Sequence, residues 1–255
     1  MLSMKNIIYI LFLFFINVSS LIKPLLIINN KQFQLKNTHK KIITISPGGL
    51  AGFYMLGAIA YIKENYDLTN YEFLSASAGA WNSLPMTYNK PMDKIVYDII
   101  NIYNNEEIKS IYELQSKFKS LLIEKYNKDD FELEKINIAT TSFTIKGFEQ
   151  KIITNINTIQ QATDSCMASS YIPLVTGLKL QKINNNIMFD GGFKKFPPPE
   201  IVSYFDIYPY MWKHDFRENC YGLLNIKTIK NSEELFENGF YDSEKNKDIL
   251  DKYFL

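Results

Sequence analysis

Short β-branched runs alternate with helical patterns of apolar residues along most of the chain. Residues 42–45 form such a run and end at Pro47-Gly48-Gly49, which predicts a buried strand entering a tight glycine turn. Apolar residues over 52–62 recur at helical spacing and predict the next helix. Residues 71–74 predict a second strand. A sharp turn over 75–79 then leads into a short helix that Pro85 kinks or ends.

The same alternation continues to the carboxyl end. Further expected elements are two helices within 91–126, strand over 136–145 with a turn at Gly147, a helix over 160–170, a short strand over 187–189, and one or two closing helices over 232–255. Strands that alternate with helices favour an α/β fold in three layers, with a mostly parallel central sheet and helices on both faces.

The amino terminus has the pattern of a targeting segment. Lys5 precedes an apolar run over 7–18, and Ser19 and Ser20 follow, which is typical of a secretory signal cleaved after Ser20. An uncleaved membrane anchor and a buried terminal helix or strand are the alternatives. We therefore expect a leader over 1–20, a connector over 21–40 and one domain over 41–255, in a protein that is secreted, lumenal or membrane-anchored.

Composition narrows the range of functions. The 255 residues are 46% hydrophobic and 15% aromatic, enough for one well-buried domain. A net charge of +1 gives no general attraction to nucleic acid. Two cysteines and two histidines are too few for a disulfide scaffold or a Cys/His zinc cage, so neither a cofactor nor a metal is expected. Cys166 and Cys220 either pair or stay as thiols.

Ser77 lies in the first of three segments that can carry chemistry. Ser75-Ala76-Ser77-Ala78-Gly79 follows a predicted strand and precedes a predicted helix, as a nucleophile elbow does. Small residues two positions before and after the serine suit the crowded turn. A serine that only caps the helix would give the same pattern.

A glycine loop precedes this elbow. Gly48, Gly49 and Gly52 lie between the first strand and the first helix, where freed backbone N–H groups suit an anion or an oxyanion. A phosphate loop is excluded because GxxxxGK[ST] is absent. A glycine turn that serves packing alone is the alternative.

Asp190-Gly191-Gly192 follows the short strand over 187–189. Two glycines let the chain turn away and leave the carboxylate at the edge where strands end. An aspartate that only makes a turn is the alternative.

Together these segments resemble the patatin-like phospholipase family, whose pattern is a GGGx[KR]G loop, a GxSxG elbow and a DG[AG] motif. The matching stretches are SPGGLAGFYMLG over 46–57, LSASAGA over 74–80, ASSYIP over 168–173 and FDGG over 189–192. A weaker match is LFENGFYD over 235–242. The resemblance implies a patatin-like fold and a lipid acyl hydrolase that acts on esters of membrane or storage lipids.

By this resemblance Ser77 is the nucleophile and Asp190 its general base, without a histidine. The chain departs from the family pattern at Pro47, Ala51 and Ser75. Because proline has no N–H, the oxyanion donors are expected at Gly48, Gly49 and Leu50.

Other mechanisms remain open. Ser77, Asp190 and His214 occur in the chain order of an α/β-hydrolase triad, and the motif departures fit a lipid-binding protein without turnover. The aromatic, basic and proline-rich segment over 193–199 suits a membrane-facing lip or an exposed connector.

Overall fold

The computed structural model describes residues 40–255 except 106, 145–146, 178–179, 184–185 and 213–231. The expected leader over 1–20 and nearly all of the connector over 21–40 lie outside the described residues, as do His214 and Cys220. Within the described ranges, no helix combines the length and apolar character needed to cross a membrane.

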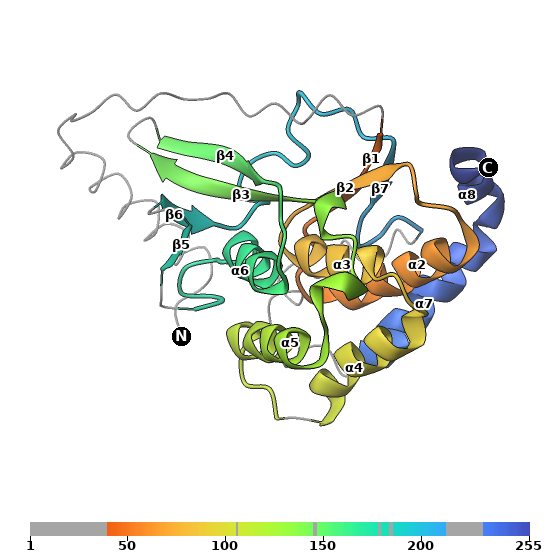
Figure 1. Ribbon diagram of the computed structural model, residues 1–255, viewed down its shortest axis with the longest axis horizontal. Coiled ribbons are helices and arrows are strands. Elements are labelled where there is room, and N and C mark those ends of the chain that lie inside the picture. The colour runs from red at the N-terminus through yellow and green to blue at the C-terminus, as the bar shows by residue number, and fades with distance from the viewer. Residues whose placement is uncertain (1–39, 106, 145–146, 178–179, 184–185, 213–231) are drawn as a thin grey trace.

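Figure 1 labels the elements in chain order. They are β1 (Lys41–Ile45), the 3₁₀ turn η1 (Gly49–Ala51), α2 (Gly52–Asn65), β2 (Tyr71–Ser75), α3 (Ala78–Thr87), α4 (Met92–Asn105), α5 (Ile111–Lys125), η2 (Lys128–Asp130), η3 (Leu133–Lys135), β3 (Ile136–Thr144), β4 (Gly147–Ile153), α6 (Ile159–Ser169), β5 (Gln181–Ile183), β6 (Asn186–Phe189), β7 (Phe205–Ile207), α7 (Ser232–Lys245) and α8 (Lys247–Phe254).

One sheet joins the described strands in the order β5-β6-β3-β2-β1-β7, with β4 paired to β3. The four strands β7, β1, β2 and β3 are parallel, whereas β4, β5 and β6 add antiparallel pairs. Ile45 is in register with Ser75, which in turn is in register with Ile138. The ends of β1 and β2 therefore bring the glycine loop and the serine elbow to one edge of the sheet.

Alternating side chains divide the strands between two apolar layers. Ile43 and Ile45 of β1 belong to the large core beneath the sheet, which the helices share. Ile42 packs with Leu74 and Ala139 on the opposite face, together with Ile201. This period of two is what an extended strand requires when both faces are covered.

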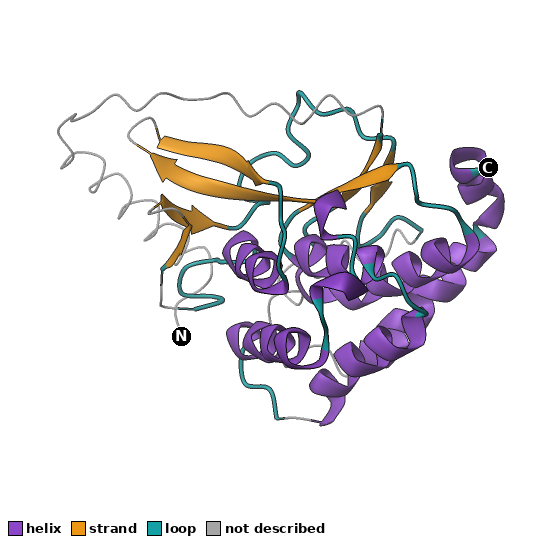
Figure 2. Cartoon of the chain, in the orientation of Figure 1, coloured by secondary structure: helices purple, strands orange, loops and turns teal. Residues whose placement is uncertain are grey.

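Figure 2 shows the described helices gathered mainly on one side of the sheet. Helix α2 lies centrally and crosses α7 so closely that glycine is needed on both. A Cβ at Gly57 would lie 1.9 Å from the carbonyl oxygen of Phe236, and one at Gly239 would lie 1.9 Å from that of Tyr54. The Tyr54 hydroxyl also donates to Asp242 at 2.8 Å. The segment over 235–242, singled out in the sequence, thus packs α7 on α2.

The α/β class and the mostly parallel central sheet are confirmed. Two details differ from expectation. Among the described residues, the second face is covered by the loop that carries Phe196 and Ile201, and a helical layer is not seen there. Of the two outcomes expected at Pro85, the helix does not end there, because α3 continues to Thr87. Since proline has no N–H, α3 loses the hydrogen bond that residue 85 would donate to the carbonyl oxygen of Trp81.

Candidate active site

Ser77 lies in a strained turn between β2 and α3. Its backbone has φ 54° and ψ −123°, a conformation that residues other than glycine rarely adopt. Although Ser77 occupies the position before the helix, its side chain forms no capping hydrogen bond. Gly79 permits the turn, since a Cβ there would lie 2.1 Å from the carbonyl oxygen of Ile45. The geometry favours an elbow over a capping serine.

Ser75 replaces the first glycine of the elbow pattern without disturbing the turn. It is fully buried, and its hydroxyl donates to the carbonyl oxygen of Asn137 at 3.3 Å. A small polar side chain at this position therefore finds an acceptor on the neighbouring strand.

Ser169 connects the elbow to the rest of the site. Its Oγ accepts the N–H of Ser77 at 2.9 Å and donates to the carbonyl oxygen of Ala139 at 2.6 Å. Its own carbonyl oxygen accepts the N–H of Gly191 at 2.8 Å. One serine at the end of α6 thus joins the Ser77 turn to the loop that carries Asp190. Sequence reasoning identified the segment over 168–173 but not this role.

Asp190 follows β6 and is almost completely buried, with 7% of its surface exposed. Its N–H donates to the carbonyl oxygen of Tyr171 at 2.8 Å, and its carbonyl oxygen accepts from the hydroxyl of Thr141 at 2.9 Å. Its Oδ1 accepts the N–H of Gly192 at 2.8 Å. Within the described part of the chain, Oδ2 is buried and has no hydrogen-bond partner.

Burial raises the pKa of Asp190 to about 6, because desolvation disfavours the charged carboxylate. The Ser77 side chain and the Gly192 N–H act in the opposite direction and lower this pKa. Ser77 and Asp190 are therefore close neighbours. No hydrogen bond of normal geometry joins their side chains, however, and Oδ2 of Asp190 is left without a partner among the described residues.

The two glycines after Asp190 are required by close packing. A Cβ at Gly191 would lie 2.2 Å from the carbonyl oxygen of Ala139, and one at Gly192 would lie 2.6 Å from Cγ of Pro47. The aspartate loop therefore lies directly against the first residues of the glycine loop. Pro47, the departure from the family pattern, is part of this contact.

The glycine loop leads into η1 with positive φ at Gly49. Gly49 and Leu50 line the same pocket as Ser77. No described residue accepts the backbone N–H of Gly49 or of Leu50, so both are suitable oxyanion donors. Gly48 is not part of the pocket lining, and a Cβ there would lie 2.6 Å from Cγ of Pro209, but no described residue accepts its N–H either. Its carbonyl oxygen accepts the N–H of Ala51 at 3.1 Å.

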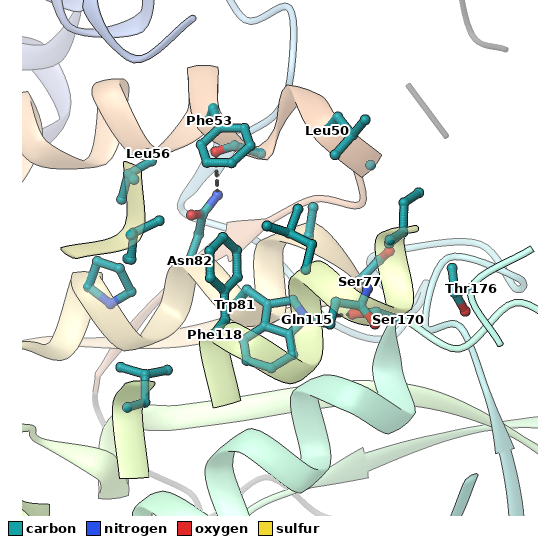
Figure 3. A pocket seen from close by; sticks show the side chains of 18 of the residues that line it. Leu50, Phe53, Leu56, Ser77, Trp81, Asn82, Gln115, Phe118, Ser170 and Thr176 are labelled. Carbon is teal, nitrogen blue, oxygen red and sulfur yellow. Dashed lines mark hydrogen bonds between the residues drawn. The ribbon is translucent and has the colours of Figure 1, made fainter. Parts of the chain in front are cut away.

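Gly52 and Asn82 close this loop onto α3. The Asn82 amide donates to the carbonyl oxygen of Gly52 at 2.9 Å, and a Cβ at Gly52 would lie 3.2 Å from that of Ala78. Figure 3 shows this hydrogen bond above the pocket. The contact fixes the start of α2 relative to the elbow.

An apolar pocket of about 80 Å³ begins at Ser77 and runs between α2, α3, α4 and α5. In Figure 3, Ser77, Ser170 and Thr176 lie at one side of it and Leu56 at the other. The described lining contains no charged side chain. It consists of Gly49, Leu50, Gly52, Phe53, Leu56, Ser77, Ala78, Trp81, Asn82, Pro85, Ile99, Ile111, Leu114, Gln115, Phe118, Leu121, Leu122, Ser170, Ile172 and Thr176.

Sequence reasoning did not find the walls of this pocket. Trp81 is fixed by a hydrogen bond from Nε1 to Ser170 Oγ at 3.1 Å. The centroid of its ring lies 6.1 Å from that of the Phe118 ring. Phe118 belongs to α5, whose amphipathic pattern indicates only a helix with one buried face. Which cavity that face lines depends on contacts between distant segments.

Cys166 does not act at this site. It is completely buried in α6 as a free thiol, and its Sγ donates to the carbonyl oxygen of Ala80 at 3.2 Å. Burial raises the pKa of this thiol, so it stays protonated. No group of three or more His, Cys, Asp or Glu side chains suited to a metal ion occurs within the described ranges.

Comparison with known proteins gives little beyond this geometry. No protein-family model matches the sequence, and no curated protein matches it. Among solved structures, the chain is similar to one in the heterodimeric complex ExoU-SpcU from the type III secretion system of Pseudomonas aeruginosa, with 12% identity and a TM-score of 0.40. The match covers 83% of this chain and 52% of the chain in that complex. This chain therefore spans about half the length of its structural neighbour. Similarity at this level supports no argument about function.

Proposed function

We propose that this chain is a serine acyl hydrolase that cleaves carboxylic esters of lipids, as its resemblance to patatin-like phospholipases implies. The observation that carries the proposal is a strained Ser77 beside a buried Asp190 at the end of an uncharged, apolar pocket. Strain at a nucleophile turn and a perturbed carboxylate next to it are typical of active sites.

Asp190 serves as the general base. It removes the proton from Ser77 Oγ as that atom attacks the ester carbonyl carbon, and the N–H groups of Gly49 and Leu50 stabilise the oxyanion. The protonated carboxyl then gives its proton to the departing alcohol, which leaves an acyl-serine. In the second half, Asp190 takes a proton from a water molecule as its oxygen attacks the acyl-serine carbonyl carbon. The carboxyl then returns this proton to Ser77 Oγ as the carbon–Oγ bond breaks, which releases the fatty acid and restores both side chains. A pKa of about 6 makes this carboxylate a stronger base than an ordinary aspartate while it stays ionised at neutral pH.

The pocket supports an acyl chain as the bound part of the substrate. Its walls are formed by aliphatic and aromatic side chains such as Leu56, Trp81 and Phe118. Such a pocket favours hydrocarbon over a charged or sugar-like group.

Labelling with a fluorophosphonate tests the proposal, because this probe reacts only with an activated serine. We expect the full chain to be labelled, Ser77→Ala to lose labelling, and Asp190→Asn to be labelled far more slowly. Ser83→Ala is the matched control, since Ser83 is fully buried in α3, the helix that follows Ser77, but does not line the pocket. A folded chain that is neither labelled nor able to hydrolyse a simple ester would instead support the lipid-binding alternative.

A second experiment separates the dyad from a triad. Because the dyad needs no imidazole, we expect His214→Ala to keep most of the esterase rate. A loss of about ten-thousandfold in a folded His214→Ala protein would show that the histidine completes a triad.

A further inference from the structure

Two exposed apolar side chains lie on the loops that build the site. Leu174 is 57% exposed and lies between Ile172 and Thr176, which line the pocket. Phe193 is 55% exposed and comes three residues after Asp190. The two loops are tied together where the N–H of Asp190 donates to the carbonyl oxygen of Tyr171 at 2.8 Å.

Both side chains are held in place rather than left loose. Leu174 has φ 66°, which a leucine rarely adopts, and its N–H donates to the carbonyl oxygen of Gly177 at 3.1 Å. The centroid of the Phe193 ring lies 5.0 Å from that of the Phe148 ring and 6.5 Å from that of the Phe189 ring. An exposed leucine in a strained turn lowers stability, so its presence calls for a function.

Positive charge accompanies these apolar groups. Lys194 and Lys195 follow Phe193 directly, both are exposed, and neither forms an ion pair with any described residue. No acidic residue occurs between Gly191 and Pro199. Because the whole chain carries only +1, this pair of lysines is a local feature.

We propose that Leu174, Phe193, Lys194 and Lys195 form an entry patch that docks the active-site mouth on a lipid surface with anionic head groups. Apolar side chains flanked by lysines bind such a surface by inserting into its interfacial layer while the cations contact head groups. Docking there brings the pocket to the lipid, so that an acyl chain can pass from the membrane to Ser77. This inference rests on the proposed acyl hydrolase function and names the surface on which it acts.

Vesicle binding by the inactive full chain, Ser77→Ala, measures docking without turnover. The probes are vesicles of phosphatidylcholine alone and of phosphatidylcholine with one part in five of phosphatidylserine. Phe193→Ser is expected to weaken binding to both by about tenfold, because it removes one inserted aromatic side chain. Leu174→Asn should act similarly, and asparagine tolerates the positive φ.

The lysines are tested separately. The double variant Lys194→Gln with Lys195→Gln should weaken binding to the anionic vesicles by about tenfold or more at low salt and leave binding to neutral vesicles unchanged. Tyr97→Ser is the matched control, because Tyr97 is 67% exposed on α4 rather than on these loops. Every variant carries the same amino terminus, so any membrane binding by that segment cancels in the comparison.

Two results would overturn the inference. One is vesicle binding that the patch variants change no more than Tyr97→Ser does. The other, in the active chain, is a patch substitution that slows hydrolysis of a water-soluble short-chain ester as much as hydrolysis of vesicle lipid, because the residues would then serve the site itself. Failure of the proposed activity has a different signature, namely vesicle binding with the expected pattern but no ester hydrolysis by the unsubstituted chain.

Discussion

Single polar atoms determine what this site can do at the scale of residues. Oδ1 of Asp190 is fixed by the N–H of Gly192, while Oδ2 has no partner among the described residues. Such an arrangement orients the carboxylate and keeps one oxygen available for a proton. Ser169 accepts the N–H of Ser77 and so helps to hold its backbone in the strained conformation.

In the proposed mechanism, the protonation state of Asp190 sets the pH dependence of hydrolysis. The base must be ionised, and burial raises its pKa to about 6, so kcat/KM is expected to rise with pH and reach half of its plateau near pH 6. Steady-state rates on a soluble ester from about pH 4.5 to 8.5 check this. A half-maximum near the ordinary aspartate value, close to pH 4, would contradict the role of the buried carboxylate.

Ser169→Ala tests positioning. The substitution leaves the N–H of Ser77 without its acceptor, so kcat is expected to fall roughly 10- to 100-fold with little change in KM. Ser165→Ala is the control, since Ser165 is a buried serine of the same helix whose hydroxyl donates only to Gln161 within that helix. Equal effects of both variants on kcat would indicate a general effect on α6.

At the scale of elements, the close contact between α2 and α7 determines how these two helices pack in the core. We expect Gly57→Ala to reduce the free energy of unfolding by about 1–3 kcal/mol or more, because the added Cβ would collide with the backbone of α7. Glu237→Ala on the exposed face of α7 should change it by less than about 0.5 kcal/mol. Denaturant titration measures both. A Gly57→Ala protein as stable as the parent would show that α2 and α7 can separate freely.

Under the proposed function, the face of α5 that lines the pocket limits the length of the acyl chain that fits. Phe118 contacts the rings of Phe53 and Trp81, so Phe118→Ala enlarges a cavity of only about 80 Å³. The variant should therefore shift its preference towards longer acyl chains by roughly tenfold or more in kcat/KM. A series of esters of increasing chain length measures the shift. Ile123→Ala, on the same helix but outside the pocket, should leave the profile unchanged.

At the scale of the whole molecule, burial of the carboxylate that we propose as the base affects the stability of the fold. Burial raises the pKa of Asp190 in the folded chain to about 6, so between about pH 4 and 6 the folded state binds more protons than the unfolded state. The stability that the protonated carboxyl contributes is present below about pH 4 and is lost as pH rises through 6.

Asp190→Asn should remove the loss of stability above pH 6, because the asparagine side chain carries no charge that burial would disfavour. Above pH 6 the variant is expected to be more stable than the parent by about 1–3 kcal/mol, and the difference should shrink towards pH 4.5. Thermal unfolding of the inactive variant and of the parent, at pH 8 and at pH 4.5, measures this difference in stability. A variant that is less stable at pH 8 would show that the carboxylate is stabilised by its surroundings.

Most local elements of this protein were predictable because their signals are local. The strand over 42–45, the glycine turn after it and the break between α4 and α5 follow from short-range periodicity and turn chemistry. Strands β5 and β7 have only three residues each, too few for a recognisable period. The position of Pro85 inside α3, and the gathering of the described helices mainly on one face of the sheet, depend on packing, which a linear pattern does not contain.

The sequence by itself determined the order of most helices and of the four strands β1, β2, β3 and β6, and the presence of Ser77, Asp190 and a glycine loop at the ends of strands. Only the tertiary structure decided that Ser169 joins the elbow to the aspartate loop, that burial raises the pKa of Asp190, and that α5 walls an apolar pocket. The physical reason is the distance along the chain over which each interaction acts. Propensity and turn chemistry act between neighbours in the chain, whereas desolvation, cavity shape and hydrogen bonds across about 90 residues exist only after distant segments pack together.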